Sequence, residues 1–152
     1  MRTGALLLGI LLLSACTGAP PPNFTGVWKL SPTRSRMGSS DPIPPAWVDT
    51  IDHREPKVKM KEERKGPDSM SVLAYATDGS ETCNVIGGNM VCSRARWEGP
   101  YLRIDSTWNQ DGVATTLQDR WSLSPDRRSL SIQRHVETPG TRTDQLIFLE
   151  KQ

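Results

Sequence analysis

After residue 23 the chain alternates between apolar and polar positions in short runs, and no stretch keeps its apolar residues at helical spacing. Pairs of turn-forming residues, such as Asp78-Gly79, Gly87-Gly88 and Asp111-Gly112, separate these runs. Short alternating runs at such close spacing are typical of an all-β sandwich or barrel. The pattern predicts about ten strands, near residues 24–30, 47–54, 57–63, 70–77, 80–86, 89–98, 101–108, 113–123, 129–137 and 142–150.

The two-residue turn at Gly87-Gly88 also predicts a strand register. Counting outward from this turn places Cys83 opposite Cys92 in a non-hydrogen-bonded pair, with Cα atoms about 4.5 Å apart. That separation is at the short end of what a disulfide tolerates. In an oxidising compartment we expect these two cysteines to bond to each other. Two free thiols or a metal pair are the alternatives, although the chain has only two histidines to support a metal.

The same counting assigns inner and outer faces. Around Gly99-Pro100 and Asp78-Gly79 it directs Leu73, Tyr75, Trp97, Ala95 and Ser93 inward, and Arg94, Arg96, Arg103 and Asp105 outward. Around residues 125–128 it pairs Leu123 with Leu130, Trp121 with Ile132, and Asp119 with Arg134 on one face. That face is apolar except for the Asp119–Arg134 pair. The last strand is ambiguous, because both of its faces carry apolar residues: Leu146 and Phe148, or Ile147 and Leu149.

Composition narrows the choice of partner. The formal net charge is +2 and falls to +1 if Arg2 is removed. This near-neutrality argues against nucleic acid as a partner. Aliphatic residues are sparse, and the 5 tryptophans compensate by burying a large area each. We therefore expect one small, aromatic core.

The N-terminal residues have the pattern of an export signal. Arg2 precedes an apolar run at residues 4–13, which is shorter than the roughly 20 residues that a membrane-spanning helix needs. Leu13-Ser14-Ala15-Cys16 resembles the bacterial lipobox, which implies cleavage after Ala15 and lipid, such as palmitate, on Cys16. An uncleaved transmembrane anchor is the alternative, but the prolines at 20–22 cannot continue a helix. The expected organisation is a signal peptide at 1–15, a lipidated stalk at 16–23 and a folded domain at 24–152.

The residue after the cysteine bears on localisation. Thr17 stands where an aspartate would retain a lipoprotein in the inner membrane under the enterobacterial sorting rule. The resemblance thus implies the outer membrane, facing the periplasm, with cell-surface display left open.

A second resemblance concerns the folded domain. The run Phe24-Thr25-Gly26-Val27-Trp28, together with the segments at 75–79, 97–99 and 119–124, resembles small secreted bacterial proteins described as lipocalin-like. This implies an antiparallel up-and-down β-barrel with a ligand cavity, without naming a ligand. Full lipocalins place an arginine near the last strand against the first-strand tryptophan, and Arg134 and Arg142 both fit that role.

Two functions are consistent with these features. In the first, the barrel binds a small apolar or amphipathic molecule through Trp28, Tyr75, Trp97, Asp119, Trp121 and Arg134, and the segment 31–46 caps its mouth. Asp119 and Arg134 would then hold a polar head group, or else form a structural ion pair. In the second, the protein is an interaction or inhibitor protein that acts through exposed loops, with contacts at Arg94, Arg96 and Arg103 or at Lys57, Lys59 and Lys61. A solvated strand face is the alternative for both basic sets.

Enzymatic function has little support. The chain has no serine nucleophile elbow, no glycine-rich phosphate loop and no histidine pair at metal-ligand spacing. Asp49, Asp52, His53 and Glu55 cluster on one predicted strand, but Asp49 and His53 lie on the face opposite Asp52. We interpret this cluster as an exposed β edge and expect a monomer that uses no cofactor and no metal.

Overall fold

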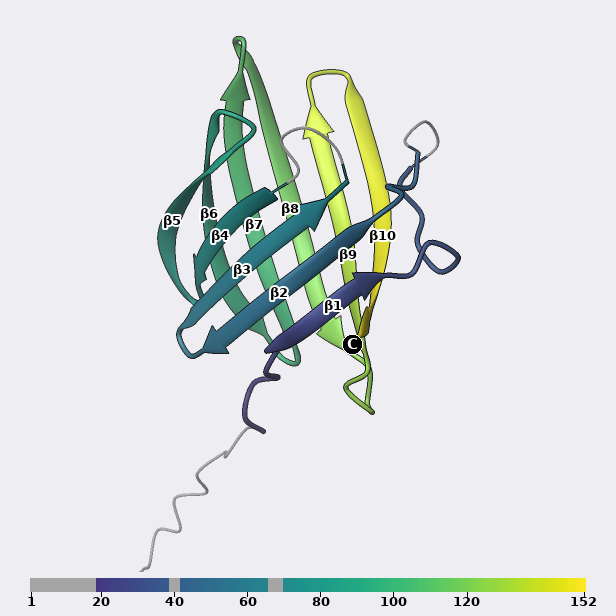
Figure 1. Ribbon diagram of the computed structural model, residues 1–152. Coiled ribbons are helices and arrows are strands. Elements are labelled where there is room, and N and C mark those ends of the chain that lie inside the picture. Colours follow the sequence, from purple (N-terminus) through teal and green to yellow (C-terminus); the bar gives the residue numbers. More distant parts are fainter. Residues whose placement is uncertain (1–18, 39–41, 66–69) are drawn as a thin grey trace, which may run out of the picture.

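The computed structural model describes residues 19–38, 42–65 and 70–152, which contain ten strands (Figure 1). The lipobox at residues 13–16 lies outside these ranges. Within them, no helix has the length and hydropathy needed to cross a membrane. The strands are β1 (Gly26–Leu30), β2 (Trp47–Arg54), β3 (Lys57–Arg64), β4 (Met70–Ala76), β5 (Asp78–Ile86), β6 (Asn89–Glu98), β7 (Tyr101–Gln110), β8 (Val113–Leu123), β9 (Ser129–Thr138) and β10 (Thr141–Lys151).

The ten strands form one antiparallel sheet that curls into a nearly closed barrel. Their order is β4-β3-β2-β1-β10-β9-β8-β7-β6-β5, so sequence neighbours pair throughout and β1 pairs with β10. The all-β prediction and the predicted strand positions are confirmed. β4 and β5 are the two edges of the sheet, and they face each other across the seam of the barrel (Figure 1).

The seam differs from the hairpin predicted at Asp78-Gly79. β4 and β5 are joined through Thr77 alone, and they are not neighbours in the hydrogen-bonded strand order. The Asn84 side chain bridges them instead: the Ala74 N–H donates to Asn84 Oδ1 at 2.8 Å, and Asn84 Nδ2 donates to the Ala74 carbonyl at 3.0 Å. The Asn84 side-chain amide therefore makes two hydrogen bonds in place of backbone pairing between β4 and β5. Leu73 is buried and Ala74 exposed, as the predicted faces require.

The register predicted at the other hairpins is confirmed. Gly87 and Gly88 both have positive φ (55° and 80°), which a tight hairpin turn requires and glycine adopts without steric cost. Cys83 lies opposite Cys92, and their sulfurs are bonded at 2.04 Å with the Cα atoms 4.0 Å apart. The predicted pairs on β6–β7 and β8–β9, including Asp119 with Arg134, also form.

Tertiary packing decides which face of the last strand, β10, points into the barrel. Ile147 and Leu149 are fully buried in the barrel, so Leu146 and Phe148 point outward. The segment after β1 covers this outer side, since Arg36 exchanges backbone hydrogen bonds with Leu146 at 2.7 and 2.8 Å. The guanidinium of Arg34 lies 4.5 Å from the centre of the Phe148 ring. Both faces of β10 are thus partly covered, which explains why both are apolar.

One end of the barrel is closed by aromatic side chains. Phe24, just before β1, is fully buried and stacks against His53 (5.7 Å between ring centres) and Trp97 (5.8 Å). Its ring also meets the edge of Trp121 at 5.6 Å. The Phe24 N–H donates to Nδ1 of His53 at 3.2 Å, which fixes the chain at its entry into the barrel. This end of the barrel is therefore filled by packed side chains.

Trp28 forms the base of the same core. Its indole N–H donates to the Phe24 carbonyl at 2.8 Å, and the cation over its ring is Lys151 of β10, at 5.3 Å. Neither Arg134 nor Arg142, the two arginines expected there, makes this contact, and Arg134 is paired with Asp119 instead. Gly26 leaves room for the lysine, since a Cβ there would lie 2.9 Å from Lys151 Cε. The Gly-x-Trp pattern thus serves a contact between the first and last strands.

Candidate functional site

An internal cavity of about 170 Å³ lies in the half of the barrel away from Phe24. Its outer rim comes from strand ends at that side, including Trp47 at the start of β2, Arg64 at the end of β3 and Ser71 early in β4 (Figure 1). Its apolar wall is formed by Met60, Leu73, Tyr75, Ile86, Val91, Trp108, Leu117, Trp121 and Ile132. Ser106, a small buried residue on the inner face of β7, also lines the cavity and leaves it space.

Five charged side chains share this cavity wall with the apolar residues. They are three carboxyl groups and two guanidinium groups: Asp49, Glu62, Asp119, Arg64 and Arg134. They come from β2, β3, β8 and β9, which lie on both sides of the β1–β10 junction. Burial of so many charges is costly unless they pair with one another. Their pairing therefore decides what the cavity can accept.

Asp119 and Arg134 form the tightest pair. Arg134 Nε donates to Asp119 Oδ1 at 2.8 Å and Nη2 donates to Oδ2 at 2.7 Å, a two-pronged arrangement. Burial lowers the pKa of Arg134, but the charge and hydrogen bonds of Asp119 outweigh this and raise that pKa overall. Both carboxylate oxygens are thereby occupied, so this arrangement fits a structural ion pair. Arg134 still faces the cavity.

Asp49 is the least satisfied of the five. It is fully buried, and Oδ1 accepts a hydrogen bond from Trp47 Nε1 at 2.8 Å. Oδ2 has no hydrogen-bond partner among the described residues. Burial, and next the charge of Glu62, raise the pKa of Asp49 to about 7. At neutral pH this carboxyl group is therefore poised between its two forms.

Glu62 and Arg64 stand near the opening. Glu62 Oε1 lies 2.9 Å from Arg64 Nε, and the Arg64 guanidinium lies 3.8 Å from the centre of the Trp47 ring. Trp47, Arg64 and Arg134 also line a second hollow of about 170 Å³, together with Met37, Pro42, Pro44 and Gln145. Part of the segment expected to cap the mouth thus lies beside it. These three shared residues form the neck between the cavity and the outside.

The strand cluster predicted as an exposed edge is not one. β2 lies between β1 and β3, and Asp49 and His53 are buried inside the barrel. Only Asp52 and Glu55 reach the surface, because a strand in the middle of a sheet alternates between core and solvent. Glu55 accepts hydrogen bonds from Trp97 Nε1 at 2.9 Å and from Thr77, and His53 Nε2 lies 2.9 Å from it. Desolvation opposes the ionised form, but these contacts lower the pKa of Glu55 overall.

The structure divides the six residues predicted to bind a ligand. Tyr75, Asp119, Trp121 and Arg134 line the cavity. Trp28 and Trp97 do not belong to its lining and pack instead at the closed end, with Phe24. Sequence reasoning missed Glu62 and Arg64, and it noted Asp49 only as part of an edge. The signal for all three was the period-two alternation of residues 47–54 and 57–64, which places them on one face.

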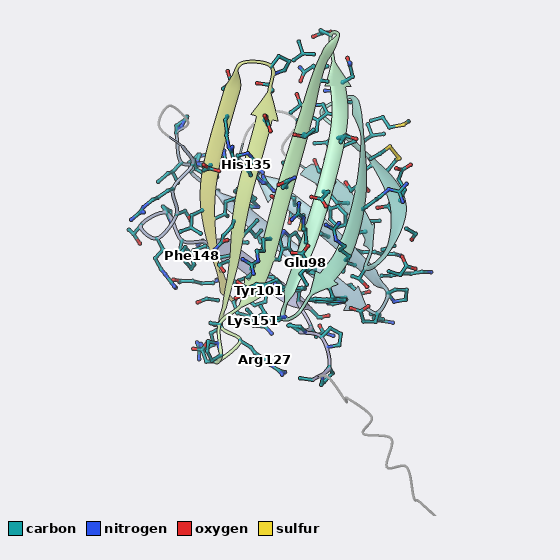
Figure 2. The ribbon with its side chains drawn as sticks, turned by 180° about the vertical axis from the view of Figure 1, so that it is seen from behind. Glu98, Tyr101, Arg127, His135, Phe148 and Lys151 are labelled. Atoms are coloured by element: carbon teal, nitrogen blue, oxygen red, sulfur yellow. A yellow bond between two sulfur atoms is a disulfide. The ribbon has the colours of Figure 1, made fainter. Side chains whose placement is uncertain are left out.

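Acidic side chains pair with the three arginines that were predicted on the outer face. Arg94 pairs with Glu81 at 3.2 Å, and Arg96 and Arg103 both contact Asp105, at 2.7 and 3.0 Å. This agrees with a solvated strand face, the alternative to a contact surface. A larger open groove of about 530 Å³ crosses the outside of β6–β10 between Glu98 and His135, both labelled in Figure 2. It is lined mainly by charged and amide side chains and is open to solvent.

One carboxylate group lies close to the two sulfur atoms of the disulfide. Glu81, Cys83 and Cys92 place one ligand-type atom each within 4.8 Å of the others. The two sulfurs are bonded to each other, and metal ions bind thiolates, so this group does not form a metal site.

Comparison with known proteins is informative through structure alone. No protein-family model matches the chain, and no curated protein matches its sequence. The barrel is similar to zebrafish ileal bile acid-binding protein complexed with cholic acid, with a TM-score of 0.62, 13% identity, and coverage of 85% of this chain and 98% of that one. The fold is lipocalin-like.

Two further solved structures have a similar barrel. Fatty-acid-binding protein 1 of Echinococcus granulosus has a TM-score of 0.57 and 14% identity, covering 84% of this chain and 96% of that one. The fatty acid binding protein of Schistosoma mansoni, in complex with arachidonic acid, has a TM-score of 0.55 and 14% identity, covering 85% and 96%. At these identities the likeness establishes the barrel fold. The ligand has to be argued from the residues of this chain.

Proposed function

We propose that this protein binds a small amphipathic molecule inside its barrel and carries or senses that molecule without chemical conversion. One observation carries the proposal: a cavity with an aromatic and aliphatic wall also holds a few converging polar groups. Ligand sites in proteins have this composition, in which apolar walls supply affinity and polar groups fix orientation. The structural relatives support the proposal, because two were solved with cholic acid or arachidonic acid bound.

The size of the cavity limits the ligand. An engineered protein cavity of about 150 Å³ binds benzene, and drug-sized ligands occupy about 300–1,000 Å³. The 170 Å³ of this cavity therefore accepts a ring or a chain of about six carbons. A longer molecule would extend through the neck between Trp47 and Arg64 into the second hollow. A complete long-chain fatty acid does not fit inside.

Lipid on Cys16 would orient this site. The chain enters the barrel at the end closed by Phe24, and the cavity rim lies at the other end (Figure 1). A lipid-anchored protein with this geometry presents its mouth away from the membrane that holds it. The ligand would then enter from the aqueous side rather than directly from the anchoring membrane. Two or more acyl chains would make such an anchor stable.

The proposal is tested by native mass spectrometry of the purified protein, followed by organic extraction. Leu117→Trp places an indole in the cavity, and Gln118→Trp places the same indole on the outer face of the same strand. A molecule that co-purifies with the native protein and with Gln118→Trp, but not with Leu117→Trp, is the expected result. A protein that carries nothing and binds no six-carbon amphiphile, in native and variant forms alike, would refute internal ligand binding.

A further inference from the structure

The arrangement of charge inside the cavity points to a particular kind of ligand head group. The wall carries three carboxyl groups and two guanidinium groups, and the twelve other lining residues, which carry no charge, cannot change that balance. When Asp49 is ionised, the wall has an excess of one negative charge. A carboxylate ligand would add a fourth carboxyl group to it. A cationic ligand would complete the pairing.

Both guanidinium groups already face a carboxylate, although Arg64 Nε, like Asp49 Oδ2, makes no hydrogen bond among the described residues. Arg134 directs two of its N–H groups at Asp119, and Arg64 lies against Glu62 and over the Trp47 ring. Each arginine thus has a carboxylate within ion-pair distance. The structural relatives in complex with cholic or arachidonic acid hold carboxylic acids, but this cavity has no arginine whose charge is left unopposed by a described carboxylate.

Asp49 is the carboxyl group of this wall that forms no ion pair with a described residue, since Arg64 pairs with Glu62 and Arg134 with Asp119. Its side chain is fully buried, it lies in the cavity wall, and Oδ2 meets no hydrogen-bond donor among the described residues. A buried acceptor without a donor is costly, and a charged one more so. Its neighbour on β3 is Glu62, a like charge, which adds to the demand for a cation.

We propose that the ligand is an amphipathic amine, whose ammonium group donates to Asp49 while its carbon chain lies against Trp121, Leu73 and Ile132. This inference rests on the proposed function and specifies its ligand class. The Trp121 indole N–H is also without a partner among the described residues, so a bound water or a ligand hydroxyl fits beside the chain. Hydrogen bonds to charged groups are about twice as strong as neutral ones, so the ammonium at Asp49 dominates recognition.

Three probes of equal chain length separate the possibilities: hexylamine, 1-hexanol and hexanoate. Their six carbons match the cavity volume, and binding is measured at pH 8 by NMR titration of the tryptophan indole N–H signals. A charge-assisted hydrogen bond corresponds to roughly a ten- to hundredfold difference in affinity. We therefore expect hexylamine to bind at least tenfold more tightly than hexanol, with hexanoate the weakest.

Asp49→Asn and Asp52→Asn form a matched pair of variants. Both remove one carboxylate from β2, but Asp49 faces the cavity and Asp52 faces solvent. Asp49→Asn should abolish the advantage of hexylamine over hexanol and leave hexanol binding intact, whereas Asp52→Asn should preserve that advantage. Retained hexanol binding also shows that the variant is folded.

The outcomes distinguish this inference from the proposed function. Binding of hexanoate or hexanol as tight as that of hexylamine would overturn the amine inference while leaving ligand binding standing. An amine preference that survives in Asp49→Asn would overturn it as well. If none of the three probes shifts an indole signal in any protein, internal binding itself is refuted.

Discussion

The buried carboxyl group of Asp49 makes the stability of this protein depend on pH in a direction opposite to that of most acidic residues. In the unfolded chain this group ionises with an ordinary pKa of about 3.9. In the folded protein, burial and then Glu62 raise the pKa to about 7, against the lowering effects of Trp47, Arg64 and Arg134. Below pH 3.9 the group is protonated in both states, so it has no effect there.

Between these two values the folded state keeps a proton that the unfolded state has released. Raising the pH therefore favours unfolding, and the free energy of unfolding falls through this window. One pKa unit corresponds to about 1.4 kcal/mol, so a shift of about three units gives a loss on the order of 4 kcal/mol by pH 7. That is a large part of the roughly 5–15 kcal/mol by which small domains are stable.

Asp49→Asn should remove this dependence. The amide keeps the size of the side chain and can accept the Trp47 hydrogen bond, but it has no proton to release. Urea unfolding of the native protein and the variant, compared at pH 4.5, 6 and 7.5, gives the difference in free energy. We expect this difference to move in favour of the variant as pH rises, by about 1.4 kcal/mol per unit up to the folded pKa.

The comparison cancels the other titrating groups, because they are the same in both proteins. Asp52→Asn, on the exposed face of β2, serves as the control and should show no such trend. A difference between native protein and Asp49→Asn that stays constant from pH 4.5 to 7.5 would show that Asp49 ionises with an ordinary pKa. The cavity would then not be short of one cation.

Three further outcomes follow from the structure. Removing the disulfide by Cys83→Ser with Cys92→Ser should lower the free energy of unfolding by about 2–3 kcal/mol, since the bond closes a short loop of sequence separation 9, and chemical denaturation of the two forms checks this. Asp119→Ala should cost about 3–5 kcal/mol by leaving Arg134 unpaired in the barrel, whereas Asp119→Leu combined with Arg134→Met should cost less, so equal losses in the two variants would contradict a buried pair. Cys16→Ser should move the protein from the membrane fraction to the soluble fraction and abolish labelling by fatty acid, and an unchanged membrane fraction would exclude a lipid anchor at this residue.

Local strand pairing was accessible from the sequence because each hairpin carries its own register information. The Gly87-Gly88 turn was sufficient to pair Cys83 with Cys92, since a two-residue turn fixes which residues face each other. The same reasoning placed Asp119 against Arg134 in the interior. It failed at Asp78-Gly79, where the strands separate and Asn84 spans the gap, because a seam arises from closure of the whole sheet.

Only part of the candidate site could be predicted from the sequence, for a related reason. Alternation within a strand tells which residues share a face, but it does not tell which strands meet across the barrel. Asp49 and Glu62 are near each other in sequence, yet their relation to Arg134 depends on β1 pairing with β10. The aromatic cluster around Phe24 could not be predicted from the sequence either, because the rings that Phe24 packs against come from β2, β6 and β8.

The sequence by itself determined that the chain forms about ten antiparallel strands, which residues of the β6–β7 and β8–β9 hairpins face inward and which cysteines bond, since these follow from turn chemistry and period-two alternation. Only the tertiary structure decided where the barrel is closed, where it is hollow and which buried charge lacks a partner. Closure brings together side chains from strands far apart in sequence, and their packing leaves one end filled by Phe24 and the other open at Arg64. The unpaired oxygen of Asp49 is a property of that packing, and no single strand contains it.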